Sequence, residues 1–330
     1  MVNTIYIEEE IAEHPRTLEI LGRFPKAVRI PCRRYGEVFN RKAQNFRLQK
    51  KQPALILARK FDNFVLPTPT GYGIGGERNF YFSHMLNCVY DCRYCFLQGM
   101  YRSAHYVVFV NYEDFETAID ETSKESRGEV TYFFSGYDCD SIALEPVTGF
   151  VESFLDFFAE RPSALIELRT KSTQVKCLEE RDPLPNCIVA YSLTPEEIGA
   201  QLEHKTPPVH RRLEMMVRLQ EWGWKVGLRF DPVVYHPDYV EQYRRLYKHV
   251  FSQIRLESLH SVSLGPFRLP KEMYETMFRL YPEERLFSGP LVRREGMVSY
   301  GEDLEEEMLG FCKQELLEHI PEELFFRCEM

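Results

Sequence analysis

The sequence predicts an α/β fold in which buried strands alternate with helices. Six runs of apolar, β-branched and aromatic residues have the length and composition of buried strands; they span residues 79–85, 130–137, 164–171, 188–193, 225–230 and 261–267. Most intervals between them show the 3.6-residue apolar spacing of amphipathic helices. A chain of 330 residues, 44% of them hydrophobic, is also long enough to bury a sizeable core as one compact unit.

The predicted helices follow these strands in order. Residues 113–126, 147–159, 211–222 and 238–254 have helical periodicity, and Gly223 stands where a helix stop is expected. Alternation of this kind implies parallel strands joined by helical crossovers. Six such units form either an open doubly wound sheet or a partial barrel. In both folds the chemistry belongs at the carboxyl ends of the strands.

Polar and sulfur-containing residues follow the ends of the predicted strands. Because the carboxyl ends of parallel strands meet at one edge of a sheet, we expect these side chains to gather on one rim. The residues in question are Cys88, Asp138, Cys139, Asp140, Lys171, Ser172, Ser192 and Asp231.

The two ends of the chain fall outside the strand–helix pattern. We expect an N-terminal basic extension over residues 1–75, the strand–helix domain over 76–270 and a C-terminal region over 271–330. Within the last region, residues 290–301 have the pattern of two short strands around Glu295 and Gly296, which indicates a β-hairpin. Residues 303–320 have the pattern of an acidic amphipathic helix.

Charge is unevenly distributed along the chain. The formal net charge is −9, yet residues 22–60 contain twelve Lys and Arg and one acid, whereas residues 301–330 contain ten acids and two bases. Aromatic residues are interleaved with the basic ones in the first segment. This pattern indicates either a solvated basic face or a local anionic partner, with nucleic acid as the candidate.

The sequence gives no sign of export or membrane insertion. The first residues are acidic and lack the apolar core of a signal peptide, and no apolar run reaches the length of a membrane span. An odd number of cysteines, nine, argues against a closed disulfide framework. We therefore expect a cytoplasmic protein with reduced thiols and no membrane partner.

Three of the nine cysteines lie within eight residues, in the sequence CVYDCRYC. Structural zinc requires four ligands, usually as two separated pairs, and no fourth ligand stands at a suitable spacing. A redox dithiol would use Cys92 and Cys95 and would not need Cys88. Thiolates are the usual ligands of iron–sulfur clusters, so an iron–sulfur cluster fits best. Three thiolates would leave one iron of a four-iron cluster open to bind a small molecule.

This motif resembles the CxxxCxΦC loop of the radical S-adenosylmethionine (SAM) superfamily, with Tyr94 as the aromatic residue. Over most of its length the chain resembles the spore photoproduct lyase family. The similar segments are residues 55–61 and 94–98, the Arg169-Thr170-Lys171-Ser172 strand end, Ser192 and the terminal hairpin. The resemblance implies a partial (β/α)6 TIM-type barrel with an N-terminal extension and a C-terminal hairpin and helix.

The resemblance also implies a function. In that family a [4Fe-4S] cluster cleaves SAM reductively to a 5′-deoxyadenosyl radical, which removes hydrogen from a thymine-dimer lesion in DNA, the lesion then reverting to two thymines. The expected partners are damaged DNA and an electron donor such as flavodoxin or ferredoxin, and the protein is expected to be a monomer.

The site residues implied by the resemblance fall into four groups. The metal ligands are Cys88, Cys92 and Cys95; the SAM contacts are Tyr94, Ser135, Gly136, Asp140, Lys171 and Ser192; the residues of the radical chemistry are Tyr94, Tyr137 and Cys139; and the DNA contacts are Arg293, Arg294 and Tyr300.

The chain departs from the family where hydrogen is returned to the product radical. The lyases carry a donor cysteine in a Cys-Thr-Ser-Asp run, whereas this chain reads Tyr137-Asp138-Cys139-Asp140. Aligning the aspartates puts Tyr137 at the donor position, and aligning the cysteines requires a shift within the loop. Phe96 also replaces a tyrosine of the lyases. Two alternatives therefore stay open. One is a lyase-like radical enzyme acting on another DNA lesion, RNA, a peptide or a small molecule. The other is a nucleic-acid-binding protein whose cluster or zinc is only structural.

Overall fold

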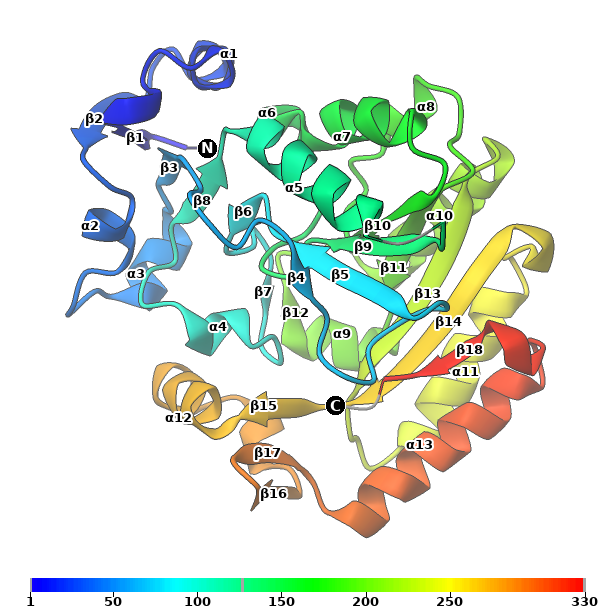
Figure 1. Ribbon diagram of the computed structural model, residues 1–330. Helices are drawn as coiled ribbons and strands as arrows, with labels where there is room; N and C mark the ends of the chain where they lie inside the picture. The colour runs from blue at the N-terminus through cyan, green and yellow to red at the C-terminus, as the bar shows by residue number, and fades with distance from the viewer. Residues whose placement is uncertain (1, 126–127, 329–330) are drawn as a thin grey trace.

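The computed structural model describes residues 2–125 and 128–328, and its largest element is a curled half-barrel sheet of eight strands (Figure 1). The strand order is β18-β14-β13-β11-β10-β9-β5-β4. In chain order the strands are β4 (Leu66–Pro67), β5 (Arg78–Phe82), β9 (Thr131–Ser135), β10 (Ala164–Thr170), β11 (Cys187–Ser192), β13 (Lys225–Val233), β14 (Leu259–Pro266) and β18 (Phe325–Arg327).

The six strands from β5 to β14 are the six that the sequence predicts. Each pairs in parallel with its neighbour, so the prediction of a partial barrel is confirmed. Two edge strands were not predicted. Short β4 pairs antiparallel with β5, and β18, near the C-terminus, pairs in parallel with β14. Both cover strands whose edges would otherwise be unpaired.

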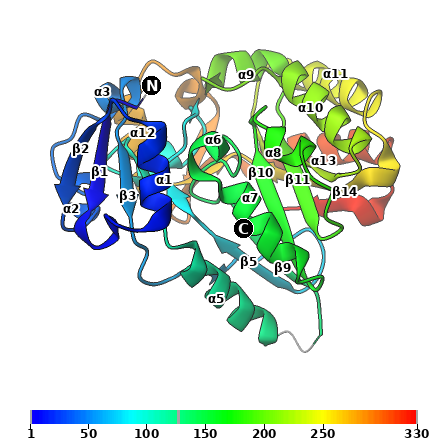
Figure 2. The same ribbon diagram turned by 90° about the horizontal axis from the view of Figure 1, so that it is seen from above.

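The connecting helices lie on the outer, convex face of the sheet (Figures 1 and 2). Successive side chains of a strand point to opposite faces; thus Phe133 and Ile166 join the main core with the helices, whereas Phe134 and Leu165 face inward. The helices are α5 (Tyr112–Lys124), α6 (Glu145–Thr148), α7 (Phe150–Ala159), α8 (Lys176–Glu179), α9 (Glu196–Leu202), α10 (Val209–Glu221) and α11 (Tyr239–Phe251). All four predicted helices are present; Ser126, the last residue of the first prediction, lies outside the described residues.

The N-terminal region forms a second sheet, which the sequence analysis did not predict. Its strand order is β2-β1-β3-β8-β6, and α1 (Pro15–Arg23) packs Ile20 and Leu21 into the small core beside it (Figure 2). The strands are β1 (Thr4–Glu8), β2 (Val28–Cys32), β3 (Leu55–Ala58), β6 (Met85–Leu86) and β8 (Tyr106–Phe109). Because β6 and β8 come from beyond residue 75, this region is integrated with the barrel rather than appended to it.

The C-terminal region contains the predicted hairpin and helix. Strands β16 (Leu291–Arg294) and β17 (Met297–Tyr300) pair antiparallel, and Glu295 and Gly296 both have positive φ angles, as a type I′ turn requires. Strand β15 (Arg268–Pro270) adds a third strand, followed by α12 (Lys271–Leu280). The acidic helix is α13 (Glu302–Leu317).

Short elements complete the fold. They are α2 (Gly36–Phe39), α3 (Phe46–Lys51), β7 (Asp91–Cys92), α4 (Leu97–Met100), β12 (Glu203–His204) and the 3-10 helices η1 (Glu9–Ile11), η2 (Leu256–Ser258), η3 (Arg285–Ser288) and η4 (Glu322–Leu324).

Candidate active site

The lumen of the half-barrel is filled at the amino ends of the strands. An apolar layer closes it there, formed by Ile74, Phe134, Leu165, Ile188 and Ala190, with Tyr72 packed against them. Above this layer Arg229 of β13 forms a buried ion pair with Glu167 of β10, with 2.6 Å between Nη2 and Oε2. The lumen is therefore a packed core with its chemistry confined to the opposite rim.

Arg169 of β10 forms the next layer toward the rim. Its guanidinium donates to the hydroxyl of Tyr72 at 2.7 Å and to Oγ of Ser192 at 3.3 Å. It also lies 3.6 Å from the carboxylate of Asp231. Ser192 and Asp231, both predicted on the rim, are thus brought together by Arg169, which the sequence analysis named only as part of a strand end.

The three clustered cysteines lie in the loop between β6 and α4, at the carboxyl side of the sheet. All three are free thiols. Burial raises the pKa of Cys88 to about 12 and raises the pKa values of Cys92 and Cys95 as well. Lys50 of α3 fixes the backbone of this loop. Its buried ammonium donates hydrogen bonds to the carbonyl oxygens of Cys88 at 3.2 Å and Tyr90 at 3.0 Å.

The donor set consists of three cysteine thiols, and thiolates are the usual ligands of iron–sulfur clusters. Across residues 2–125 and 128–328, no three His, Cys, Asp or Glu side chains converge closely enough to hold one metal ion. In a cubane cluster each cysteine binds a different iron, so the thiols need to surround a volume rather than a point. Burial raises the pKa of the Cys95 thiol, whereas the nearby cations of Lys171, Lys50 and Arg169 lower it. These cations would also stabilise a cluster held by thiolates, because such a cluster is anionic.

A second strand clamps the cysteine loop. Strand β12 pairs antiparallel with β7, which places Glu203 opposite Cys92, and the amide of Arg93 donates to the carbonyl of Leu202 at 2.7 Å. The hydroxyl of Tyr94 donates to the carboxylate of Glu203, which also accepts from Arg212 of α10. Sequence reasoning missed Glu203 and Arg212.

One local signal was available for Arg212. It lies between Val209 and Leu213 on the buried face of α10, where a charged residue requires a partner. The signal shows that a counter-charge exists but does not say where in the chain it lies.

The loop after β9 carries the predicted SAM contacts Ser135, Gly136 and Asp140. The hydroxyl of Ser135 donates to the carbonyl of Glu167 at 2.8 Å and lies 2.8 Å from Oγ of Ser141. Gly136 has φ of +80°, and a Cβ there would lie 2.5 Å from Oγ of Ser141. The loop therefore requires glycine at this position.

Asp140 fixes the same loop against the end of β10. Its carboxylate accepts from the hydroxyl of Thr170 at 2.6 Å and from the amide of Lys171 at 2.7 Å. It also accepts from the amides of Ile142 and Ala143. Burial raises the pKa of this carboxyl, and these hydrogen bonds act in the opposite direction.

Tyr137 and Cys139 follow β9 but lie in different surroundings. Tyr137 is 36% exposed, stacks on Tyr81 of β5 with ring centroids 4.4 Å apart, and lies 5.5 Å from the ring of Phe96. Cys139 is 8% exposed and packs in the core of the N-terminal sheet, with Met85 among its neighbours. Tyr137 is thus partly exposed beside Phe96 at the end of the cysteine loop. Cys139 is buried, but it lies close enough to Cys88 for the two thiols to interact electrostatically.

Lys171 lies at the end of β10 and approaches the clamp. Its ammonium is 3.9 Å from the carboxylate of Glu203 and 5.5 Å from the centre of the Tyr94 ring. The side chain is only slightly exposed. Lys171 and Tyr94, predicted as cofactor contacts, are thus brought together with the cysteine loop.

The C-terminal hairpin is attached to the cysteine loop through α12. The guanidinium of Arg93 lies 3.6 Å from the centre of the Tyr281 ring and 3.3 Å from the carboxylate of Glu284. A Cβ at Gly99 of α4 would lie 2.4 Å from the carbonyl oxygen of Met273, so α4 and α12 are in close contact.

Of the three predicted DNA contacts, two are exposed and one is buried. Arg293 and Arg294 are exposed, with Glu275 and Glu302 as ion-pair partners at 3.7 and 3.3 Å. Tyr300 is buried, and its hydroxyl accepts a hydrogen bond from the amide of Tyr235 at 2.8 Å. Tyr300 is therefore not presented on the surface of the hairpin, because this side of β17 packs into the core.

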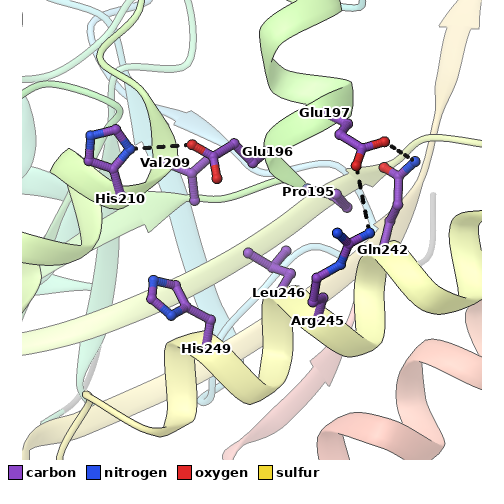
Figure 3. Close-up of a pocket in the computed structure, with 9 residues that line it drawn as sticks. All are labelled: Pro195, Glu196, Glu197, Val209, His210, Gln242, Arg245, Leu246 and His249. Carbon is purple, nitrogen blue, oxygen red and sulfur yellow. Dashed lines mark hydrogen bonds and ion pairs between the residues drawn. The ribbon is translucent and has the colours of Figure 1, made fainter.

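A separate pocket of about 480 Å³ lies outside the barrel, between α9, α10 and α11 (Figure 3). Its charged residues pair with one another: His210 with Glu196 at 3.3 Å, and Arg245 with Glu197 at 3.6 Å. It receives none of the side chains from the rim of the barrel.

No helix in the described part of the chain has the length and apolar character needed to cross a membrane.

The family model for spore photoproduct lyase matches residues 79–305. A spore photoproduct lyase from Bacillus subtilis (strain 168) is 23% identical over 307 residues, which are 90% of this chain and 87% of that protein. Another from Geobacillus sp. (strain Y412MC61) is 21% identical over 202 residues, 60% of this chain and 59% of that one.

Solved structures show the same fold. A spore photoproduct lyase mutant with bound AdoMet (SAM) and dinucleoside spore photoproduct superimposes with a TM-score of 0.83 at 17% identity, covering 100% of this chain and 99% of that chain. A spore photoproduct lyase complexed with the dinucleoside spore photoproduct gives 0.81 at 18% identity, covering 100% and 98%. With the cysteine loop, the half-barrel and the family match together, the chain belongs to the spore photoproduct lyase family and is a radical SAM lyase.

Proposed function

We propose that this enzyme repairs a thymine-dimer lesion of the spore photoproduct type in DNA. The observation that supports the proposal most is the cysteine loop at the open rim of a barrel whose other end is filled. Such a rim presents one reaction site to a base extruded from the DNA stack. The family match extends over the same part of the chain.

We assign the [4Fe-4S] cluster to Cys88, Cys92 and Cys95 and the contacts with SAM to the surrounding rim. When bound, the cluster and SAM supply a 5′-deoxyadenosyl radical that removes a hydrogen atom from the substrate. Lys171 would face the SAM carboxylate, and Ser192 and the backbone of Gly136 would line the cofactor. Ser135 and Asp140 already make hydrogen bonds within the protein, so we assign them the role of holding this rim in place.

We assign the return of hydrogen to Tyr137 rather than to Cys139. A hydrogen donor must reach the substrate radical, and Tyr137 is partly exposed beside Phe96, whereas Cys139 is packed under the N-terminal sheet. Tyr81 and Tyr137 also provide a stacked aromatic surface at the mouth, where an extruded base can stack. Tyr94 is buried against Glu203 and has no direct role in this transfer.

We assign the contacts with the DNA backbone to basic residues around the mouth. Arg293 and Arg294 are exposed on the hairpin, and the basic N-terminal segment lies on the other side of the cysteine loop, where Lys50 of α3 supports it. Release of counterions from phosphates makes such binding salt-dependent.

The chemistry also requires an electron donor, and we propose a small redox protein of the flavodoxin or ferredoxin type. All nine cysteines are free in the structure, which supports a reducing, cytoplasmic environment. We propose that the enzyme works as a monomer.

An anaerobic product assay tests this function. The reconstituted enzyme, supplied with reductant, SAM and dinucleoside spore photoproduct, should form thymine residues together with 5′-deoxyadenosine. Formation of 5′-deoxyadenosine without repair would favour the second candidate, a lyase-like enzyme with another substrate. The departure of residues 137–140 from the lyases' Cys-Thr-Ser-Asp run is the observation that keeps this candidate open. Loading with zinc and no cleavage of SAM would exclude both.

A further inference from the structure

Glu203 is a buried carboxylate at the centre of the clamp, with its side chain 1% exposed. It stands directly opposite Cys92 in the β7–β12 pair. A buried carboxylate requires hydrogen bonds or cations around it. The groups that donate hydrogen bonds or positive charge to the Glu203 carboxylate therefore indicate which parts of the chain it holds in place.

Three groups surround this carboxylate. Oε1 accepts a hydrogen bond from the hydroxyl of Tyr94, and Oε2 accepts one from Nη2 of Arg212. The ammonium of Lys171 lies 3.9 Å from Oε1. Tyr94 is between Cys92 and Cys95 in the sequence, so the first bond attaches the cysteine loop to β12 at its middle.

Arg212 extends the network to the rim. Its guanidinium donates to the carbonyl of Ser192 at 3.1 Å and to the carbonyl of Pro207 at 2.8 Å, in addition to the Glu203 carboxylate. The end of β11, the strand β12 and the cysteine loop are thus fixed to one another through two buried charges. Local hydrogen bonds of this kind decide how precisely a site is held.

Lys171 is held less firmly by the same carboxylate. Within the part of the chain that the structure describes, Glu203 is its single ion-pair partner, and 3.9 Å is longer than a hydrogen bond. Because this distance is too long for a hydrogen bond to Glu203, the ammonium of Lys171 retains donors for a further acceptor.

We propose that Glu203 is a positioning residue for the cysteine loop, which fixes Tyr94 and orients Lys171 toward the cofactor. It acts through these two residues and through Arg212, and does not itself touch substrate. The role rests on the proposed cluster at Cys88, Cys92 and Cys95. It does not depend on which substrate the enzyme repairs, because the network contains no residue assigned to DNA.

The test compares three variants of the full chain after anaerobic reconstitution. Tyr94→Phe removes the hydroxyl and leaves the ion pair intact, and Glu203→Gln removes the charge. Glu196→Gln is the matched control, because Glu196 is an exposed glutamate on neighbouring α9. The measurements are the rate of iron loss to a chelator and the electron paramagnetic resonance spectrum of the reduced cluster, each with and without SAM.

We expect Tyr94→Phe and Glu203→Gln to lose iron about tenfold faster than the parent. Losing a hydrogen bond to a charged acceptor should make local opening of the cysteine loop at least about tenfold more frequent. The spectrum and its response to SAM should change in both variants and stay unchanged in Glu196→Gln. An unchanged spectrum in Tyr94→Phe would overturn the proposal even if iron loss accelerates, because the role would then be one of stability alone.

If Glu203→Gln does not fold, Tyr94→Phe decides the question by itself. No DNA is used in these measurements. A failure to repair the thymine lesion therefore leaves this test intact, and a failure of this test leaves the repair assay intact.

Discussion

The buried pair of Glu167 and Arg229 provides a quantitative test of how the lumen is stabilised. The guanidinium of Arg229 donates to both oxygens of Glu167, at 3.2 and 2.6 Å. It also donates to the carbonyls of Leu228 and Ser261, at 2.9 and 3.1 Å, and to Oγ of Ser261 at 2.9 Å. Five hydrogen bonds thus satisfy a cation that is shielded from water.

Glu167→Gln keeps the shape of the side chain and removes its charge. The remaining amide oxygen can still accept one hydrogen bond, so the main effect is that the charge of Arg229 loses its counter-ion. Breaking a buried ion pair on one side costs about 3–5 kcal/mol, and we expect a loss of this size in the free energy of unfolding. Replacing both residues, as Glu167→Leu with Arg229→Met, should cost less than the single change, because no charge is left unpaired.

Urea unfolding at neutral pH measures these differences by linear extrapolation. Glu196→Gln serves as the control, because its partner His210 is exposed and the loss should stay within about 0.5 kcal/mol. A loss below about 1 kcal/mol for Glu167→Gln would refute the reasoning. So would a double variant that is less stable than the single one.

Three further predictions concern the site, the hairpin and the pH dependence. Tyr137→Phe should allow cleavage of SAM but abolish clean formation of thymine. Cys139→Ala should still form thymine and should lose about 1–2 kcal/mol in the free energy of unfolding, because it leaves a small cavity. The reverse pattern in product analysis would assign the hydrogen donor to Cys139. The double change Arg293→Ala with Arg294→Ala should lower the slope of log affinity for DNA against log salt by about 1–2, and an equal slope in both proteins would remove the hairpin from the interface. Burial raises the pKa of Glu145 to about 7, above its value in the unfolded chain. Its protonated form therefore contributes stability that is fully present below about pH 4.5 and is lost as the pH rises through 7. Glu145→Gln should flatten this pH dependence of the free energy of unfolding between pH 5 and 8, and an unchanged slope would contradict the assignment.

The alternation of strands and helices was predictable because the strands are continuous apolar runs with periodic helices between them. The choice of a partial barrel over an open sheet came from the family resemblance. The N-terminal sheet was missed for a physical reason. Its strands β1 and β2 are only partly buried, and its pairing brings residue 5 beside residue 55, and residue 55 beside residue 106. Contacts of this range leave no periodic signal in the sequence.

The cysteine loop was predictable because all its ligands are local. Glu203 was not, because it meets Tyr94 from 109 positions away. Tyr300 was assigned to DNA together with Arg293 and Arg294, because all three lie on the hairpin that resembles that of the lyases. Side chains alternate between the faces of a strand, however, and in β17 Val298 and Tyr300 share the buried face. The apolar character of Val298, two residues before Tyr300, was the sequence signal that the two side chains share the buried face of β17.

The filled lumen has a kinetic consequence. Because Ile74 and its neighbours close the barrel at the amino ends of the strands, the proposed cofactor and the proposed DNA lesion must share the opening at the carboxyl ends. A DNA strand lying across that opening would trap whatever small molecule is beneath it. Turnover should therefore follow a compulsory order in which SAM enters before DNA and its fragments leave after it. Excess DNA should then inhibit by occupying an entrance that the next SAM molecule needs.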